Sequence, residues 1–397
     1  MPDKNLAIDR FVLLYALAWA GGAIAYTPLL TILLPVMVAG LAGKQLGVDW
    51  LGTIALAGAV AASFGGVVFG YLSDVTRNRR GWIFGGLVLS CVMLIEIGHA
   101  RGLGELIAAI VGWQLALNMM LGPLTAWAGD IVPDHRKGLL GGLMAFAPGL
   151  GALSGAVVTQ PGLAAHDSRL LLVAGLVALC VLPVLILPAP TMPNQRVTNG
   201  TFISQAALHV SFRFSPVVRM WFARLAVQVA EATLFAYLFF WLTSIDPAVT
   251  DNQTARLFST IMLISAPLTL AIGRWSDTTG HPIRPLQTCA LVAAGGLAVM
   301  VFAKDLVSAI LGYAFFGLSS AVFLALHSAQ TLRVLPRPDR RGRDLGLFNL
   351  ANTIPSLVMP WFVMALVPLF GFSVLFILLA ILAATAGLML GKPFCRN

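Results

Sequence analysis

The chain has 397 residues, of which 58% are hydrophobic and only 10% charged, and its mean hydropathy is +0.89. This composition exceeds what a soluble core needs, so it excludes an ordinary soluble domain and indicates an integral membrane protein. The formal net charge is +9, and the placement of the basic residues along the chain accounts for it without a nucleic-acid partner.

Twelve apolar stretches, separated by polar breaks, are candidates for membrane spans. A transmembrane helix needs about 20 predominantly apolar residues. The predicted spans are residues 11–40, 49–72, 82–99, 104–129, 138–160, 170–188, 217–243, 255–275, 285–303, 305–329, 345–367 and 371–391. The first is too long for the hydrophobic region of a signal peptide, so we expect it to remain as a span. The sequence therefore predicts an all-α, polytopic membrane protein.

Lys and Arg are distributed unequally over the connections between these spans. If the N-terminus is cytoplasmic, 19 of them fall on the cytoplasmic side. Only Lys44, Arg101, Arg169, Arg256 and Lys304 fall on the other side. Because basic residues are retained on the cytoplasmic side of a membrane, both termini are predicted to be cytoplasmic, in a multi-pass protein of the inner membrane. The basic residues would then lie beside anionic lipid.

The four cysteines give no sign of a disulfide framework or a metal site. Cys91, Cys180 and Cys289 fall inside predicted spans, and Cys395 lies in the C-terminal tail. The sequence also lacks a G-x-x-x-x-G-K-[ST] phosphate-binding loop. We therefore expect no cofactor, no metal, no catalytic residues and no enzymatic activity, and any active transport would draw on an ion gradient.

The longest polar break between spans divides them into two sets of six. We predict an N-terminal bundle at residues 1–188, a cytoplasmic linker at 189–216 and a C-terminal bundle at 217–397. The later part of the linker, Phe202 to Phe214, is either an amphipathic helix on the membrane surface or an unstructured tether.

Two short motifs recur between the halves. Gly70-Tyr-Leu-Ser-Asp74 follows the second span, and Gly273-Arg-Trp-Ser-Asp277 follows the second span of the other half, 203 residues later (277 − 74). After the fourth spans, Pro133-Asp-His-Arg-Lys-Gly138 corresponds to Pro338-Asp-Arg-Arg-Gly-Arg343 at an offset of 205 residues (338 − 133). Two repeats at matching positions indicate duplicated six-helix halves with a site between them, the architecture of alternating-access transporters.

The connection after the second span resembles the loop signature of the major facilitator superfamily, G-x-x-x-D-x-x-G-R-[RK]. Gly70, Asp74, Arg79 and Arg80 match it, whereas Arg77 stands where a glycine is usual. The resemblance implies twelve helices in two pseudo-symmetric six-helix bundles and transport by alternating access. It also implies a conformational latch on the cytoplasmic side that consists of Gly70, Asp74, Arg77, Arg79, Arg80, Asp130, Gly273 and Asp277.

A narrower resemblance concerns the fourth and eleventh spans. The run from Asn118 to Asp130 is similar to a motif of sucrose/proton symporters and of their glycoside-pentoside-hexuronide relatives, and Leu345 to Pro355 is similar to their eleventh helix. This resemblance implies a sugar-like or other small polar solute. Gln114 and Thr125 replace an Asp and an Arg of the plant members, so proton coupling would need other groups, or the substrate differs.

The seventh span carries the strongest candidates for transport chemistry, because a charge at bilayer depth is costly. Arg224, Gln228 and Glu231 fall within one narrow arc of a helix. The two charged residues are separated by about 10.5 Å of helical rise, so we expect each to interact with another helix or with a solute. Glu231 lies near mid-depth and suits reversible protonation. Arg224 would hold an anionic or hydroxyl-rich solute; a structural contact between helices is the alternative for both.

Other polar residues inside predicted spans are candidates for the same pathway. These are Gln114 and Asn118, one turn apart in the fourth span, Tyr26 and Thr27 in the first, and Asn349 and Asn352 in the eleventh. Neutral amides and hydroxyls suit polar solutes, but they also join helices in membranes.

The sequence leaves three functions open. The first is a proton- or cation-coupled importer of a small polar solute. The second is a proton-coupled exporter of drugs or metabolites, since Ala147-Pro148-Gly149-Leu150-Gly151-Ala152 partly matches a motif of facilitator exporters. The third is a non-transporting membrane assembly factor on the same fold. The expected partners are a small solute, protons and membrane lipid, with no nucleic acid, and the expected state is a monomer.

Overall fold

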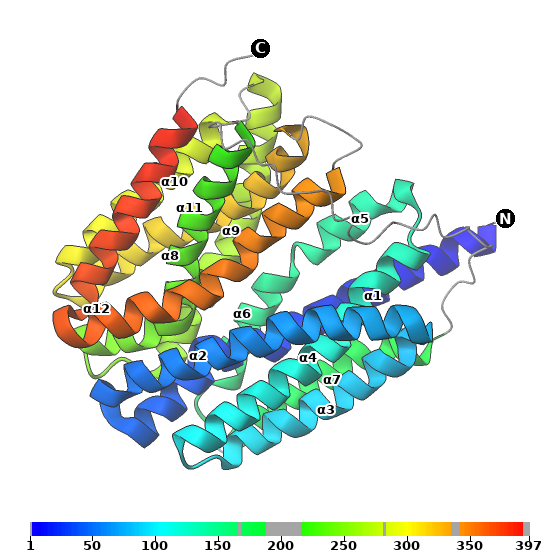
Figure 1. Ribbon diagram of the computed structural model, residues 1–397, viewed down its shortest axis with the longest axis horizontal. Coiled ribbons are helices and arrows are strands. Elements are labelled where there is room, and N and C mark those ends of the chain that lie inside the picture. Colours follow the sequence, from blue (N-terminus) through cyan, green and yellow to red (C-terminus); the bar gives the residue numbers. More distant parts are fainter. Residues whose placement is uncertain (1, 166–167, 188–215, 281–282, 335–340, 392–397) are drawn as a thin grey trace.

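The computed structural model describes residues 2–165, 168–187, 216–280, 283–334 and 341–391. Residues 189–215 of the linker predicted at 189–216 therefore lie outside the described residues, and Pro216 begins a helix. The described chain is built of helices (Figure 1). In order they are α1 (Pro2–Pro28), the π-helical turn η1 (Leu29–Leu33), α2 (Leu34–Thr76), α3 (Arg79–His99), α4 (Leu103–Ile131), α5 (Asp134–Met144), α6 (Ala147–Val158), α7 (Arg169–Ile186), α8 (Pro216–Ile245), α9 (Asp251–Thr279), α10 (Arg284–Phe302), α11 (Leu306–Val334) and α12 (Arg341–Gly391).

Among the described residues, eleven helical stretches are long and apolar enough to cross a membrane. The last of them, Ile354–Gly391, has 38 residues, which is nearly twice the length that one pass needs. Gly371 interrupts its helix with φ 73° and ψ 179°, and Figure 1 shows the chain reversing between the orange and red parts of α12. This stretch therefore makes two passes, and the prediction of twelve spans is confirmed.

The spans form two sets, α1 to α7 and α8 to α12, which lie side by side and diverge toward the two termini (Figure 1). The second span of each set ends in the same backbone conformation. Arg77 follows α2 with φ 50° and ψ 24°, and Gly280 follows α9 with φ 67° and ψ 19°. The two positions are 203 residues apart, which is the offset of the Gly-Asp motif. The left-handed conformation costs a residue with a Cβ atom about 1–2 kcal/mol, so Arg77 carries a strain that Gly280 avoids.

Two spans depart from a continuous α-helix beside the centre of the molecule. The first span passes through η1 directly after Pro28. The predicted span at 138–160 is present, but it consists of α5 and α6. Pro148 has no N–H to donate to the carbonyl of Met144, four residues earlier, and α5 ends at that methionine.

Side-chain caps set several helix starts at the membrane faces. Thr250 and Gln253 form a capping box at the start of α9. Asn78 accepts a hydrogen bond from the Gly81 N–H at the start of α3. Asp305, directly before α11, accepts hydrogen bonds from the Ser308 N–H and hydroxyl, and these bonds lower the pKa of Asp305.

Close backbone contact between neighbouring helices depends on small residues. At Gly296 of α10, an added Cβ atom would lie 2.5 Å from the Phe316 nitrogen and 2.8 Å from the Gly312 carbonyl oxygen of α11. Both of these are backbone atoms, which cannot move independently of the helix. An added Cβ atom at the adjacent Gly295 meets nothing within 4 Å.

We expect Gly296→Ala to destabilise the protein by about 1–3 kcal/mol, because α10 and α11 must separate to accept the methyl group. Gly295→Ala is the matched control and should be neutral or slightly stabilising, since alanine favours the helix. Thermal unfolding of both variants in detergent measures the difference. Equal melting temperatures would show that α10 and α11 do not pack as described.

Candidate functional site

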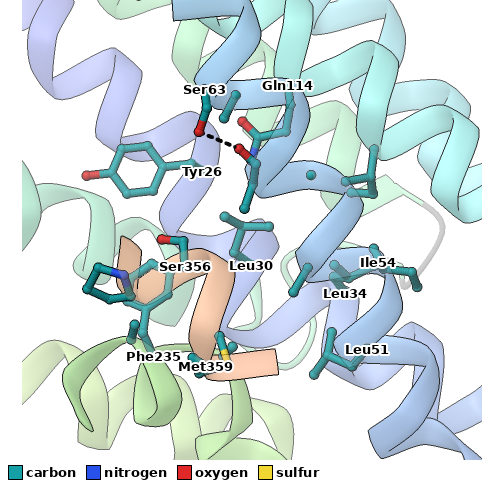
Figure 2. A pocket seen from close by; sticks show the side chains of 18 of the residues that line it. Tyr26, Leu30, Leu34, Leu51, Ile54, Ser63, Gln114, Phe235, Ser356 and Met359 are labelled. Carbon is teal, nitrogen blue, oxygen red and sulfur yellow. Dashed lines mark hydrogen bonds between the residues drawn. The ribbon is translucent and has the colours of Figure 1, made fainter. Parts of the chain in front are cut away.

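A central cavity of about 510 Å³ lies between the two halves (Figure 2). Its wall is formed by α1, η1, α2 and α4 from the first half and by α8 and α12 from the second. The cavity has a polar and an apolar end. Figure 2 shows Tyr26, Ser63 and Gln114 together at one end and Leu51 and Ile54 at the other.

Five of the sequence candidates line this cavity. They are Tyr26 of α1, Gln114 and Asn118 of α4, and Gln228 and Glu231 of α8. The helices bring together residues that are up to 205 positions apart (231 − 26). Their place in the cavity wall is a structural observation, while their role in transport remains a prediction.

Two further polar residues of the wall were not among the candidates. Ser63 and Ser356 both line the cavity. The Ser63 hydroxyl donates to the Ala59 carbonyl at 2.8 Å. Serine is common in transmembrane helices because its hydroxyl can bond to its own helix, so only the position of Ser63 and Ser356 inside predicted spans could have indicated them.

Among the described residues that line the cavity, Glu231 is the only acidic one. Within the described part of the chain, no hydrogen bond or ion pair joins its carboxylate to another residue. Gln228, one turn earlier on the same helix, has a buried Oε1 atom without a hydrogen-bond partner. The α8 wall therefore presents two oxygen acceptors whose partners are not protein groups of the described residues.

Arg224 is not among the residues that line the cavity, so its role of holding a solute stays a prediction. Its Nη1 atom donates to the Ser328 hydroxyl of α11 at 3.0 Å and contacts the Leu324 carbonyl and His327 Nδ1 at 3.4 Å. The structure therefore matches the alternative of a contact between helices, here α8 and α11. The arginine side chain is long, so its guanidinium reaches the neighbouring helix α11 although the Cα atom of Arg224 lies on the same side of α8 as those of Gln228 and Glu231.

His327 completes this contact between α8 and α11. Its Nε2 atom lies 2.8 Å from the Met220 carbonyl oxygen, and its Nδ1 atom faces Arg224. A carbonyl oxygen only accepts hydrogen bonds and a guanidinium only donates them. Nε2 must therefore carry the proton while Nδ1 accepts, so the geometry corresponds to a neutral imidazole. This contact holds α8 in register against α11. Arg224 lies about two helical turns before Glu231 on α8.

The remaining pathway candidates lie elsewhere. Thr27 is 3% exposed and packs against α6, where an added Cβ atom on Gly151 would lie 2.7 Å from its hydroxyl. It therefore belongs to the contact between α1 and α6. Asn349 and Asn352 lie in α12, but their side chains are outside the described residues. Ser356, four residues after Asn352, is on the cavity wall.

The predicted latch residues of the first half form a cluster centred on Arg79. Its guanidinium pairs with Asp74 at 2.5 Å and with Asp130 at 3.2 Å, and it donates to the Ser73 hydroxyl at 2.6 Å. These contacts join the ends of α2, α3 and α4. Gly122 of α4 faces the backbone of Gly70, since an added Cβ atom on Gly122 would lie 3.4 Å from the Gly70 nitrogen, whereas one on Gly70 would meet nothing within 4 Å.

The other latch candidates do not join this cluster. Arg80 donates to the Leu187 carbonyl at 2.8 Å and lies over the Trp127 ring at 5.4 Å, whereas Arg77 is exposed at the end of α2. Gly273 lies in α9, and the side chain of Asp277 is outside the described residues. We name this side of the molecule the basic face; it holds Arg77, Arg79, Arg80, Arg136, Arg274 and Arg284. No hydrogen bond or ion pair among the described residues joins the two halves there.

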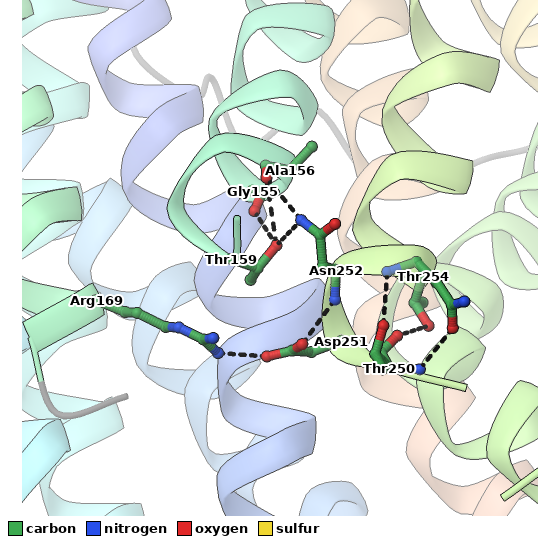
Figure 3. Close-up of polar contacts among 9 residues, drawn as sticks. Gly155, Ala156, Thr159, Arg169, Thr250, Asp251, Asn252 and Thr254 are labelled. Carbon is green, nitrogen blue, oxygen red and sulfur yellow. Dashed lines mark hydrogen bonds and ion pairs between the residues drawn. The ribbon is translucent and has the colours of Figure 1, made fainter. Parts of the chain in front are cut away.

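The opposite face is closed by polar contacts between the halves (Figure 3). Arg169 at the start of α7 forms an ion pair with Asp251 at the start of α9, and the two side chains are 13% and 20% exposed. The amide of the neighbouring Asn252 donates to the Ala156 carbonyl at 3.0 Å and to the Thr159 hydroxyl at 3.1 Å. These bonds satisfy acceptors at the C-terminal end of α6. We name Arg169, Asp251, Asn252 and Thr159 the opposite-face gate.

Further contacts reinforce the closure. The Tyr237 hydroxyl of α8 donates to the Val48 carbonyl of α2 at 3.4 Å. An added Cβ atom on Gly52 of α2 would lie 2.6 Å from the Met364 side chain of α12. The cavity is therefore separated from the opposite face by tightly packed helices. No group of three or more His, Cys, Asp or Glu residues that could hold a metal ion occurs in the described part of the chain.

Two halves of six spans around a central cavity, with one face sealed, form the architecture of a membrane transporter. The family model of the Major Facilitator Superfamily matches residues 11–317 and 248–393. The chain belongs to this superfamily, which confirms the resemblance seen in the sequence.

The structure is also similar to solved transporters. The nucleoside transporter NupG matches with a TM-score of 0.73 at 13% sequence identity, over 96% of this chain and 98% of that one. The peptide transporter POT in complex with sulfate matches with a TM-score of 0.70 at 15% identity, over 96% and 93% of the two chains. At these identities the likeness establishes the fold alone. No curated protein sequence matches the chain.

We expect Asp251→Asn to open the opposite face more often, because it leaves the guanidinium of Arg169 without its ionic partner. Loss of one partner from a largely buried polar pair costs about 1–3 kcal/mol, which corresponds to about a tenfold rise in the open population. Spin labels at Leu163 and Ala248, both exposed on this face, report the separation by electron-spin distance measurement.

The control for this experiment is Arg256→Gln, which removes an exposed charge from the same helix, α9. It should leave the distance distribution unchanged. If Asp251→Asn gives the same distribution as the control, the ion pair does not hold the opposite face closed.

Proposed function

We propose that the protein is a secondary transporter that carries a small solute through its central cavity by alternating access, coupled to proton movement at Glu231. The observation that carries the proposal is the position of Glu231. Its carboxylate lies on the wall of a cavity between two halves and has no ionic partner among the described residues. A passive scaffold has little use for such a group at membrane depth, whereas a transporter can load it with a proton or a solute.

The proposal includes the orientation of the chain. The basic face would be cytoplasmic, because Arg77, Arg79 and Arg80 lie there and basic residues are retained on that side. Both termini would then be cytoplasmic, in the inner membrane. With this orientation the sealed opposite face is the outer face, and the described state is the one in which the cavity faces the cytoplasm. The protein would act as a monomer, since each chain contains a complete cavity.

The Arg79 cluster would serve as the cytoplasmic latch. In the described state its ion pairs stay within the first half. When the cytoplasmic face closes, Asp74 would move beside the N-terminal end of α12, whose unpaired N–H groups favour a negative charge. Arg79 keeps Asp74 in position for that contact. The latch and the opposite-face gate would then close in alternation, with one engaged in each state.

Glu231→Gln tests the proton site directly. Glutamine keeps the shape of the side chain but neither loses nor gains a proton, so we expect solute-driven proton movement to fall at least about a hundredfold. The measurement uses proteoliposomes with an internal pH dye and a panel of sugars, organic anions and organic cations. Glu96→Gln, which changes an exposed acid of α3, is the control and should behave as the unmodified protein. Unchanged proton movement in Glu231→Gln would contradict the assignment.

Asp74→Asn tests the latch. The loss of the charge should weaken the state that is closed at the cytoplasmic face by about 0.3–1 kcal/mol or more, so the described state becomes more populated. Spin labels at Thr76 and Thr278, exposed ends of α2 and α9, would show a larger share of long distances. A shift toward short distances would mean that Asp74 opposes closure.

A further inference from the structure

The polar part of the central cavity offers oxygen acceptors beside the amide N–H groups of Gln114, Asn118 and Gln228. The Asn118 amide donates to the Gln114 carbonyl at 2.9 Å, and the Ser63 hydroxyl donates to the Ala59 carbonyl at 2.8 Å. The Ser63 hydroxyl proton and one of the two Asn118 N–H groups are thus used within their own helices, which leaves the Asn118 Oδ1 atom and the lone pairs of Ser63 as acceptors beside the second Asn118 N–H. A ligand that fits these acceptors must bring N–H or O–H donors.

Helix α8 adds two further oxygen acceptors to the cavity wall, from Glu231 and Gln228. The ionised Glu231 carboxylate only accepts hydrogen bonds, and the buried Gln228 Oε1 atom has no partner among the described residues. A buried acceptor without a hydrogen bond costs free energy until something donates to it. Both residues line the same cavity one turn apart, so a single group with several N–H bonds can serve both.

The charge of the cavity wall also favours a ligand that is a cation. Among the described residues that line the cavity, Glu231 is the one acid, and none is Lys or Arg. Arg224 contacts α11 instead, two helical turns from Glu231. Because Coulomb attraction weakens with distance, a cation in contact with Glu231 gains more than it loses to the distant guanidinium. An anion would meet the carboxylate with no cation on the wall to offset it.

The opposite end of the cavity is apolar. Leu34, Leu51, Ile54, Phe235 and Met359 line it, with Ser356 beside Phe235 as its polar exception, and Figure 2 shows Leu51 and Ile54 apart from Ser63 and Gln114. Hydrocarbon placed there leaves water and contacts carbon atoms. A fully hydroxylated solute would leave its hydroxyl groups unpaired at this end.

We propose that the cavity binds a small amphipathic organic cation, with a protonated amine at Glu231 and Gln228 and a hydrocarbon body against Leu51, Ile54 and Phe235. This inference rests on the proposed function and names the substrate class of the same site. It differs from the sugar-like solute that the sequence resemblance implies, because sugars lack both the positive charge and the apolar body. An ammonium group has three donors and no acceptor, so it can donate to both the Glu231 carboxylate and the Gln228 Oε1 atom.

The test compares ligands that share one shape and differ in charge. The full-length protein in lipid nanodiscs is titrated by calorimetry at pH 7.5 with 1-adamantylammonium, 1-adamantanol and adamantane-1-carboxylate. The same comparison is repeated on a smaller hydrocarbon skeleton, here called a frame, with cyclohexylmethylammonium, cyclohexylmethanol and cyclohexanecarboxylate. On at least one frame, the amine should bind at least about tenfold more tightly than the alcohol, and the carboxylate most weakly.

Glu231→Gln should reduce the preference for the amine over the alcohol to less than about threefold, while the alcohol keeps its affinity and so shows that the cavity is intact. Glu96→Gln removes an exposed carboxylate outside the cavity and should keep the full preference. Tighter binding of the carboxylate, equal binding of the three forms, no binding on either frame, or a preference that survives in Glu231→Gln would each overturn the inference. Since this readout is binding, failure here with proton movement intact leaves the proposed transport function standing.

Discussion

The hydrocarbon core of a membrane offers no hydrogen bonds to a polypeptide backbone, and the rest of this structure follows from that constraint. The described spans are helical, and the chain leaves helical geometry at Gly43, Arg77, Gly280 and Gly371, which lie at the ends of spans where water is available. The exceptions inside the membrane are η1 and the break between α5 and α6. The turn η1 contacts α1, α2, α8 and α9, so its irregular backbone is enclosed by protein. At the break between α5 and α6, Ala145 and Phe146 are exposed, and their N–H groups donate to the carbonyls of Gly141 and Leu143.

The same constraint governs where charge occurs. Ion pairs of the described residues lie at the two faces, with Arg79 on one and Arg169 on the other. Between them, the cavity wall holds a single acid. Polar contacts at the faces lie near water, which can take their place when the halves move apart, and this makes them suitable for changing partners. A lone carboxylate at mid-depth is different, since its charge state decides what the cavity can hold.

Helix periodicity predicts which side of a helix a residue's Cα atom lies on, but it does not predict which neighbouring helix the end of a long side chain contacts. The spacing of Arg224, Gln228 and Glu231 places their Cα atoms on one arc, and the two shorter side chains do line the cavity. The guanidinium of Arg224 extends to α11 and meets Ser328 and His327. Which helix stands beside α8 is a property of the packing, so no pattern within the seventh span could have separated Arg224 from the other two.

The sequence by itself determined the membrane class, the twelve spans, the repeated Gly-Asp motif and five residues of the cavity wall. These depend on hydrophobicity and on local spacing, which a single chain displays directly. Only the tertiary structure decided that the opposite face is sealed by Arg169, Asp251 and Asn252, and that Thr27 packs against α6. Such facts require residues from separate helices to be placed within hydrogen-bond distance, and that placement comes from the packing of all the spans together.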